Sequence, residues 1–345
     1  MTDNIILNKM FKGYKIPRTL SYSRLSDFDR NGPKALIKRS APHSYGLTLG
    51  SLIDDLAIPE EGFEFEDKYI ISDYEKPTST SGKLVDIVLE NYTELPNTKE
   101  LKEICRKNNF WKRSKDDTLE KYVTNPDLIG YLKDHIQSST KMIVSSQQHI
   151  QAKEIAHIIQ SHPNSSYIFD ESKTRLYQYK LDFEYNGIKF RGYADIVLID
   201  HKNKTIEVVD LKTGKGDLEQ FKSSFIKFRY YFQSFLYQEA ASTILKEYGF
   251  NDYTIKPFKF LYVGRYQKIP FSFEVTNKWQ YASKHGFILN GYKYRGVDEL
   301  LEEIVWHFDN GIYDSSRYAY ENGGLKALDD DIIQLLDEES GSKQV

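Results

Sequence analysis

The spacing of apolar residues predicts helices in the first part of the chain. Residues 19–28 begin with Ser and Thr capping candidates and continue with apolar residues at helical spacing, until an Asn-Gly-Pro break ends the helix. A second helix is expected at 48–58, because Pro59 follows it. Isoleucines at helical spacing predict a longer amphipathic helix at 139–160.

The pattern changes after Pro163, where apolar and polar residues alternate and turn sequences separate the runs. Two long helices are also expected in this part, at 217–246 and at 276–310. This order of elements predicts a mixed α/β core, in which helices flank a sheet. The predicted strands are 166–170, 174–185, 188–200, 204–213, 258–266 and 269–275.

Residues 60–140 fit neither pattern. A strand candidate at Phe63–Ile71 is followed by a Ser/Thr-rich break and several polar helices, which is typical of an insertion rather than of a core sheet. We therefore predict four parts: an N-terminal helical part at 1–59, a helical insertion or cap at 60–140, the core at 141–310, and a C-terminal extension with an acidic tail at 311–345.

Composition excludes several classes of protein. The chain has one cysteine, Cys105, which rules out a disulfide framework within it and a thiolate cluster for zinc or iron–sulfur. The N-terminal sequence lacks the apolar run of a signal peptide, and no stretch approaches the roughly 18 apolar residues that span a membrane. We therefore expect an intracellular, cytoplasmic protein that does not contact a membrane.

Charge is distributed unevenly. The net charge of −3 argues against a protein that coats nucleic acid through bulk charge. However, residues 1–40 carry nine Lys or Arg against three acidic residues, and 329–339 carry six acidic residues and no basic one. The acidic tail is a candidate docking segment for a protein partner or a mimic of DNA, and solvated surface is the alternative at both ends.

The hairpin sequence GYADIVLIDHKNKTIEVVDLKTGKG brings two carboxylates and a lysine together. Side chains alternate along a strand, so Asp210 and Lys212 share one face, while the carbonyl of Leu211 can turn toward the same place. With a turn at about 200–204, Asp195 lies opposite Asp210, roughly 5 Å away across the strands.

Two interpretations fit this hairpin: a surface hairpin with a cross-strand ion pair, or a metal site with its catalytic lysine. Both carboxylates lie in apolar strands, where burying a charge is costly unless something compensates it. Two carboxylates and a carbonyl suit Mg²⁺, with Mn²⁺ as a substitute, better than zinc. Beside such an ion Lys212 could orient or deprotonate the attacking water or neutralise the phosphorane, and we expect the ion to depress its pKa.

The same residues resemble the core of the PD-(D/E)xK nuclease superfamily, in the branch of RecB-like, RecE-like and lambda-type exonucleases. In that branch the pattern reads G-x-x-D, a hydrophobic strand, and D-x-K-T-G. The resemblance implies a restriction-endonuclease-like core, a mixed sheet flanked by helices, at 141–310. It also implies that Asp195, Asp210 and the carbonyl of Leu211 bind the metal and that Lys212 is catalytic.

Two further motifs match this branch. Gln233 and Tyr237 form its Q-x-x-x-Y motif on one helical face, and by resemblance they contact DNA or brace the catalytic site. The N-terminal SYSRLSDF matches S-x-S-R/K-L-x-x-F, so Ser23 and Arg24 are candidate phosphate contacts at a helix start. The alternatives are a chance match on an amphipathic helix and a capped helix with a surface arginine.

Two positions depart from the family pattern. Where the branch tends to have G-x-x-x-H on an early helix, this chain has Gly50 and then Asp54, which is a candidate additional metal ligand. A glutamate common on the strand before Asp195 is replaced by Gln178. If these changes are signs of drift, the chain is a nuclease-derived DNA-binding module that has lost catalysis.

The resemblance implies a Mg²⁺-dependent DNA exonuclease of recombination, repair or replication, and a phage origin would place it in the host cytoplasm. A structure-specific or restriction-type endonuclease is the alternative with the same chemistry. Lys215 and Arg229 follow the site and are candidates to line a path for DNA phosphates. Candidate stacking surfaces for bases are Phe225, Phe228, Tyr230 and Tyr231.

Overall fold

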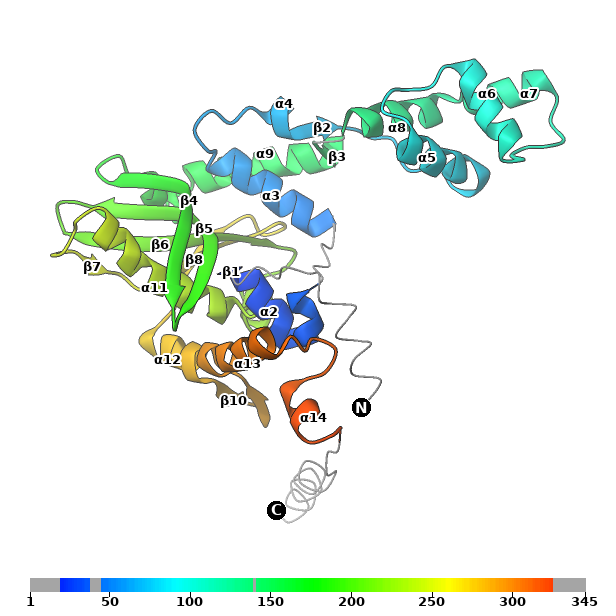
Figure 1. Ribbon diagram of the computed structural model, residues 1–345. Helices are drawn as coiled ribbons and strands as arrows, with labels where there is room; N and C mark the ends of the chain where they lie inside the picture. The colour runs from blue at the N-terminus through cyan, green and yellow to red at the C-terminus, as the bar shows by residue number, and fades with distance from the viewer. Residues whose placement is uncertain (1–18, 38–44, 139–140, 325–345) are drawn as a thin grey trace, which may run out of the picture.

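The computed structural model describes residues 19–37, 45–138 and 141–324, which Figure 1 draws as ribbons. Within them, a mixed sheet of seven strands forms the centre, helices cover both of its faces, and a separate group of helices extends away from it (Figure 1). The predicted mixed α/β class is therefore confirmed. The acidic tail at 329–339 lies outside the described residues.

The sheet is built mostly from the alternating part of the chain. Its strands are β1 (Thr19–Leu20), β4 (Thr174–Tyr185), β5 (Ile188–Asp200), β6 (Thr205–Gly214), β7 (Thr254–Ile255), β8 (Lys259–Gly264) and β9 (Pro270–Glu274). β5 pairs antiparallel with β4 and β6, β8 runs parallel to β6, and β9 runs antiparallel to β8. Asn186 and Gly187, with φ of 49° and 75°, make the tight turn of the β4–β5 hairpin.

The sheet has a gap beside β5. β4 pairs with β5 along 188–199 and so occupies one whole edge of that strand. β1 and β6 share the other edge, β1 at 189–190 and β6 at 196–200. In the part of the chain that the structure describes, 191–195 therefore have no strand partner at that edge. β6 in turn leaves β5 after Val209 and continues beside β8. The two central strands therefore diverge at the position of the predicted site.

Two layers of helices cover the sheet. The helices on one face are α2 (Tyr22–Asn31), α10 (Leu218–Lys227), α11 (Tyr230–Glu247), α12 (Asn277–His285) and α13 (Val297–Asn310), and those on the other are α3 (Tyr45–Ala57) and α9 (Ser146–Ser161). α9 starts at a capping box between Ser145 and Gln148 and buries Ala152, Ile155 and Ile159, which recur at helical spacing. Each of the two fully buried isoleucine side chains contributes about 1.5–3 kcal/mol.

The separate group of helices has a core of its own, formed around Leu84, Val88, Leu101 and Leu132. It comprises α5 (Ser79–Asn91), α6 (Thr98–Lys107), α7 (Asp116–Val123) and α8 (Pro126–Gln137). The short parallel strands β2 (Tyr69–Ile71) and β3 (Met142–Val144) connect it to the rest of the chain (Figure 1). The domain boundaries at 59, 140 and 310 stay a prediction.

Several expected elements differ from the structure. The strand expected at 63–71 is the short helix α4 (Phe65–Lys68) followed by β2, and that expected at 166–170 is the 3₁₀ helix η2 (Ser166–Phe169). The helix expected at 139–160 starts only at Ser146, because β3 pairs with β2. These short apolar runs fit a strand and a helix equally well.

The helix expected at 276–310 is interrupted. α12 ends at Gly286, which has φ of 88°, and a hairpin of β10 (Phe287–Leu289) and β11 (Tyr292–Tyr294) precedes α13. Asn290 and Gly291, both at positive φ, form its two-residue turn. Within the described ranges, no helix is long and apolar enough to cross a membrane.

Candidate functional site

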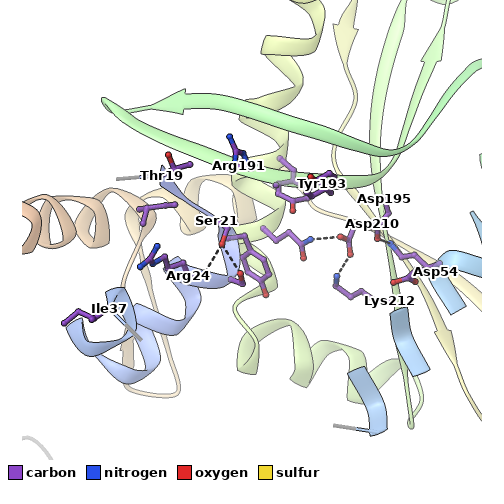
Figure 2. Close-up of a pocket in the computed structure, with 17 residues that line it drawn as sticks. Thr19, Ser21, Arg24, Ile37, Asp54, Arg191, Tyr193, Asp195, Asp210 and Lys212 are labelled. Atoms are coloured by element: carbon purple, nitrogen blue, oxygen red, sulfur yellow. Dashed lines mark hydrogen bonds and ion pairs between the residues drawn. The ribbon is translucent and has the colours of Figure 1, made fainter. Parts of the chain in front are cut away.

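A pocket with a cavity volume of about 830 Å³ opens where β5 and β6 diverge. Figure 2 shows Asp54, Asp195, Asp210 and Lys212 together at one end of it and Ile37 at the other. Nine of the eleven predicted site residues line this pocket, although they come from five separate elements. These nine are Ser23, Arg24, Asp54, Asp195, Asp210, Leu211, Lys212, Gln233 and Tyr237.

β6 places the acidic and basic groups of the D-x-K motif on one face. Leu211 is buried in the core on the opposite face, so Asp210 and Lys212 point toward α11. The Lys212 ammonium pairs with Oδ2 of Asp210 and lies 5.0 Å from the centre of the Tyr230 ring. Asp195 accepts a hydrogen bond of 2.8 Å from the N–H of Leu211. Because the N–H and C=O of a residue leave a strand at the same edge, the Leu211 carbonyl also faces this opening.

α11 supports the site from one side. Nε2 of Gln233 donates to Oδ1 of Asp210 at 2.5 Å, and both side chains are buried. Tyr237, one turn later, packs against the β5 backbone at Gly192, where a Cβ would lie 2.8 Å from the Tyr237 hydroxyl. Of the two motif residues, Gln233 thus holds the Asp210 carboxylate and Tyr237 supports strand β5 at Gly192.

Burial raises the pKa of the three carboxyl groups that line the pocket, those of Asp54, Asp195 and Asp210. Burial and the neighbouring Asp210 raise the pKa of Asp195 to about 8. Burial also raises the pKa of Asp210, although Lys212 favours its charged form, and burial followed by Asp195 raises the pKa of Asp54. Burial alone would lower the pKa of Lys212, but Asp210 and other neighbours raise it well above the usual value. The chain without a metal ion therefore does not lower the pKa of Lys212. The depression expected from the sequence depends on a bound ion.

The donor set fits a hard divalent cation. Asp195 and Asp210 interact directly, and together with the Leu211 carbonyl they offer the oxygen ligands that Mg²⁺ and Mn²⁺ prefer. Oε1 of Gln233 is buried, and it has no hydrogen-bond partner among the residues that the structure describes. Among the described residues, no three His, Cys, Asp or Glu side chains stand close enough together to hold a metal, so Asp54 stays a prediction as a ligand.

The N-terminal motif forms the far wall of the pocket. Ser21 caps α2 by accepting a hydrogen bond of 3.3 Å from the N–H of Arg24. Arg24 lines the pocket, and its guanidinium donates to the carbonyl of Leu36. The motif thus presents Ser23 and Arg24 to the same cavity as the carboxylates, although 171 positions separate Arg24 from Asp195 in the sequence.

An irregular step in the β4–β5 hairpin positions Asp195. The pairing passes from Tyr179↔Ala194 to Tyr177↔Ile196 without joining Gln178 to Asp195, and Gln178 has a left-handed φ of 46°. Ala194 and Val197, three residues apart, consequently face the same core. Sequence alternation alone did not indicate this step, and Gln178 does not line the pocket.

Some predicted DNA contacts lie elsewhere. Lys215 is exposed beyond the end of β6 and does not line the pocket. Of the four aromatic candidates for stacking, Phe225 and Tyr231 are buried in the core, whereas Phe228 is 38% exposed. Sequence reasoning missed Tyr22, whose hydroxyl donates to the Phe228 carbonyl at 2.6 Å, because nothing in the N-terminal motif marks it.

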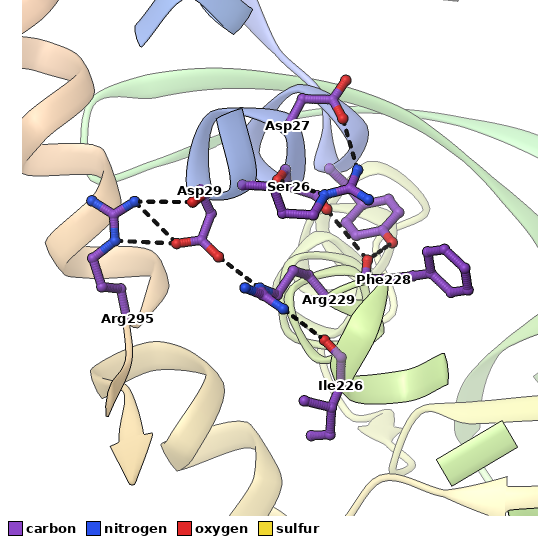
Figure 3. A network of polar contacts seen from close by, with 9 residues as sticks. Ser26, Asp27, Asp29, Ile226, Phe228, Arg229 and Arg295 are labelled. Atoms are coloured by element: carbon purple, nitrogen blue, oxygen red, sulfur yellow. Dashed lines mark hydrogen bonds and ion pairs between the residues drawn. The ribbon is translucent and has the colours of Figure 1, made fainter. Parts of the chain in front are cut away.

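Arg229 takes part in a network of ion pairs (Figure 3) and does not line the pocket. It stands at the start of α11 with φ of 60° and donates to Asp29 of α2 at 2.6 Å. Arg295 donates to the same carboxylate at 3.1 Å and also pairs with Glu303. The network ties α2, α11 and α13 together, so this geometry favours a structural role for Arg229.

The comparison with family models agrees with this geometry. The family model described as the PD-(D/E)XK nuclease superfamily matches residues 62–302. The match includes the segment 62–140, which the sequence motifs did not cover, and leaves out the N-terminal SYSRLSDF motif. Among solved structures, the chain is similar to a candidate exonuclease from Eubacterium rectale at 14% identity and a TM-score of 0.39, over 94% of this chain and 88% of that one. No curated protein matches the chain.

Proposed function

The chain belongs to the PD-(D/E)XK nuclease superfamily, and on this premise we propose that it is a Mg²⁺-dependent deoxyribonuclease, an intracellular exonuclease of DNA recombination, repair or replication. Nucleases of this superfamily generally use divalent metal ions. The observation that carries the proposal is the placement of Asp195, Asp210 and Lys212 at one end of one pocket.

We assign the metal to Asp195, Asp210 and the Leu211 carbonyl. Two residues hold the Asp210 carboxylate in place, Gln233 at one oxygen and Lys212 at the other. Asp195 is fixed in turn by the N–H of Leu211. When bound, a divalent cation polarises the scissile phosphate and lowers the pKa of the attacking water.

Lys212 and the far wall of the pocket would handle the DNA phosphates. The Lys212 ammonium lies beside the carboxylates, so it can offset the negative charge that develops on the phosphate during cleavage. Ser23 and Arg24 would position the neighbouring phosphate, a contact that carries no sequence information. Tyr237 supports this arrangement by holding β5 at Gly192.

Exonuclease action is favoured by the motifs. β1 and α2 bound the cavity on one side, and β6 and α3 bound it on the other. The Gln233 and Tyr237 motif and the D-L-K-T-G sequence resemble the exonuclease-containing branch.

The test is digestion of end-labelled linear DNA, single- and double-stranded, with Mg²⁺, Mn²⁺ or EDTA. We expect metal-dependent release of short products and no cleavage by Asp210→Ala. Circular single-stranded and circular duplex DNA should stay intact. Cleavage of circles would establish an endonuclease instead, and DNA binding without any cleavage would establish a binding module.

A further inference from the structure

The unpaired edge of β5 lies directly beside the proposed catalytic carboxylates. Among the described residues, peptide groups within 191–195 that face away from β4 have no strand partner, because β1 and β6 occupy that edge only on either side of this stretch. Arg191, Gly192, Tyr193 and Asp195 all line the pocket. Backbone polar groups normally find a partner, so this edge suits a polar ligand that runs along it.

Two side chains stand on this edge next to the cavity. Tyr193 is 50% exposed, and no hydrogen bond or ring contact holds its ring in the part of the chain that the structure describes. Arg191 is 58% exposed and pairs with Asp182 at 2.8 Å across the hairpin. An ion pair this exposed contributes little, so Arg191 can exchange it for a phosphate at small cost.

The backbone that carries these two side chains is firmly supported. Gly192, which lies between them, packs so closely on Tyr237 of α11 that a Cβ at Gly192 would stand 3.0 Å from Cε1 of the ring. Tyr237 is itself buried. Tyr193 thus projects an exposed aromatic ring from a strand that packs closely on α11, which is the arrangement of a stacking platform for a base.

We propose that Arg191 and Tyr193 form a nucleotide subsite for single-stranded DNA. Tyr193 stacks on the base of the nucleotide next to the scissile phosphate, and Arg191 binds the phosphate on its far side. The inference rests on the proposed nuclease function and adds the form of the substrate: an unpaired strand, held without sequence preference because every base has a π-face. Figure 2 shows both side chains along the wall that leads to Asp195.

The experiment compares Tyr193→Ala with Tyr193→Phe and with Tyr292→Ala, a matched control whose tyrosine is 72% exposed on the β10–β11 hairpin. Steady-state cleavage is measured on a single-stranded oligonucleotide and on copies with one abasic site at each position near the labelled end. We expect Tyr193→Ala to raise KM about ten-fold with little change in kcat, as loss of one stacked base does. Tyr193→Phe and Tyr292→Ala should resemble the wild type.

One abasic position should raise the KM of the wild type to a similar extent and have no further effect in Tyr193→Ala. A Tyr193→Ala KM within two-fold of the wild type, or an abasic effect that persists in the variant, would overturn the subsite. Fluorescence anisotropy of the same oligonucleotides in EDTA measures binding independently. Absence of cleavage with a Tyr193-dependent binding signal would therefore reject the nuclease proposal and retain the subsite.

Discussion

Replacing Asp29 with asparagine should destabilise the chain by about 2–3 kcal/mol. The carboxylate of Asp29 is only 7% exposed and receives Arg229 at 2.6 Å and Arg295 at 3.1 Å. Removing one partner of a buried ion pair typically costs about 3–5 kcal/mol, because a charge is left buried and unpaired. We expect less here, since the arginine side chains are 19% and 28% exposed and Arg295 keeps its pair with Glu303.

Asp27→Asn is the matched control on the same helix. Asp27 pairs with Arg30 at 2.7 Å, three positions away, at side-chain exposures of 26% and 36%. Such a surface pair contributes no more than about 0.5 kcal/mol. Urea unfolding followed by circular dichroism, with a common m-value, gives both free-energy changes. Equal losses in the two variants would refute the view that the Asp29 network holds α2 against α11.

Three further substitutions test the site itself. Gly192→Ala should cost about 1–3 kcal/mol of stability by forcing Tyr237 to move, and an unchanged urea midpoint would contradict the close packing. Gln233→Leu should lower activity or metal affinity about 10–100-fold by releasing Asp210, as measured by metal titration of the cleavage rate. Lys212→Ala should slow cleavage about 100–1000-fold. Fluorescence anisotropy should show DNA binding within two-fold of the wild type. Parallel losses of cleavage and binding would indicate a binding role for Lys212 instead.

The sequence was sufficient to predict the part of the site that neighbouring segments of the chain form. Alternation and turn residues predicted the strands at 174–185, 188–200 and 204–213, and the structure confirms them. The position of the turn then determines which residues lie opposite each other in the hairpin. The proximity of Asp195, Asp210 and Lys212 could therefore be predicted from three adjacent segments of the sequence. The roles of these residues stay a proposal.

Features that depend on tertiary packing could not be predicted from the sequence. The gap at 191–195 depends on where β1, a two-residue strand far away in the sequence, meets β5. The left-handed Arg229 and its pairing with Asp29 depend on the packing of α2 against α11. Neither feature produces a periodic pattern in the sequence. Tyr193 is likewise indistinguishable in the sequence from other strand residues, and only the structure shows that its ring is exposed beside the cavity.

Crystals soaked in Mn²⁺ test the account most directly, with anomalous scattering measured above the manganese absorption edge. The account predicts one strong peak between the carboxylates of Asp195 and Asp210, at about 2.0–2.3 Å from an oxygen of each and near the Leu211 carbonyl. The peak should vanish in Asp210→Ala. An active preparation whose crystals hold no manganese between these two carboxylates would contradict the proposed metal site.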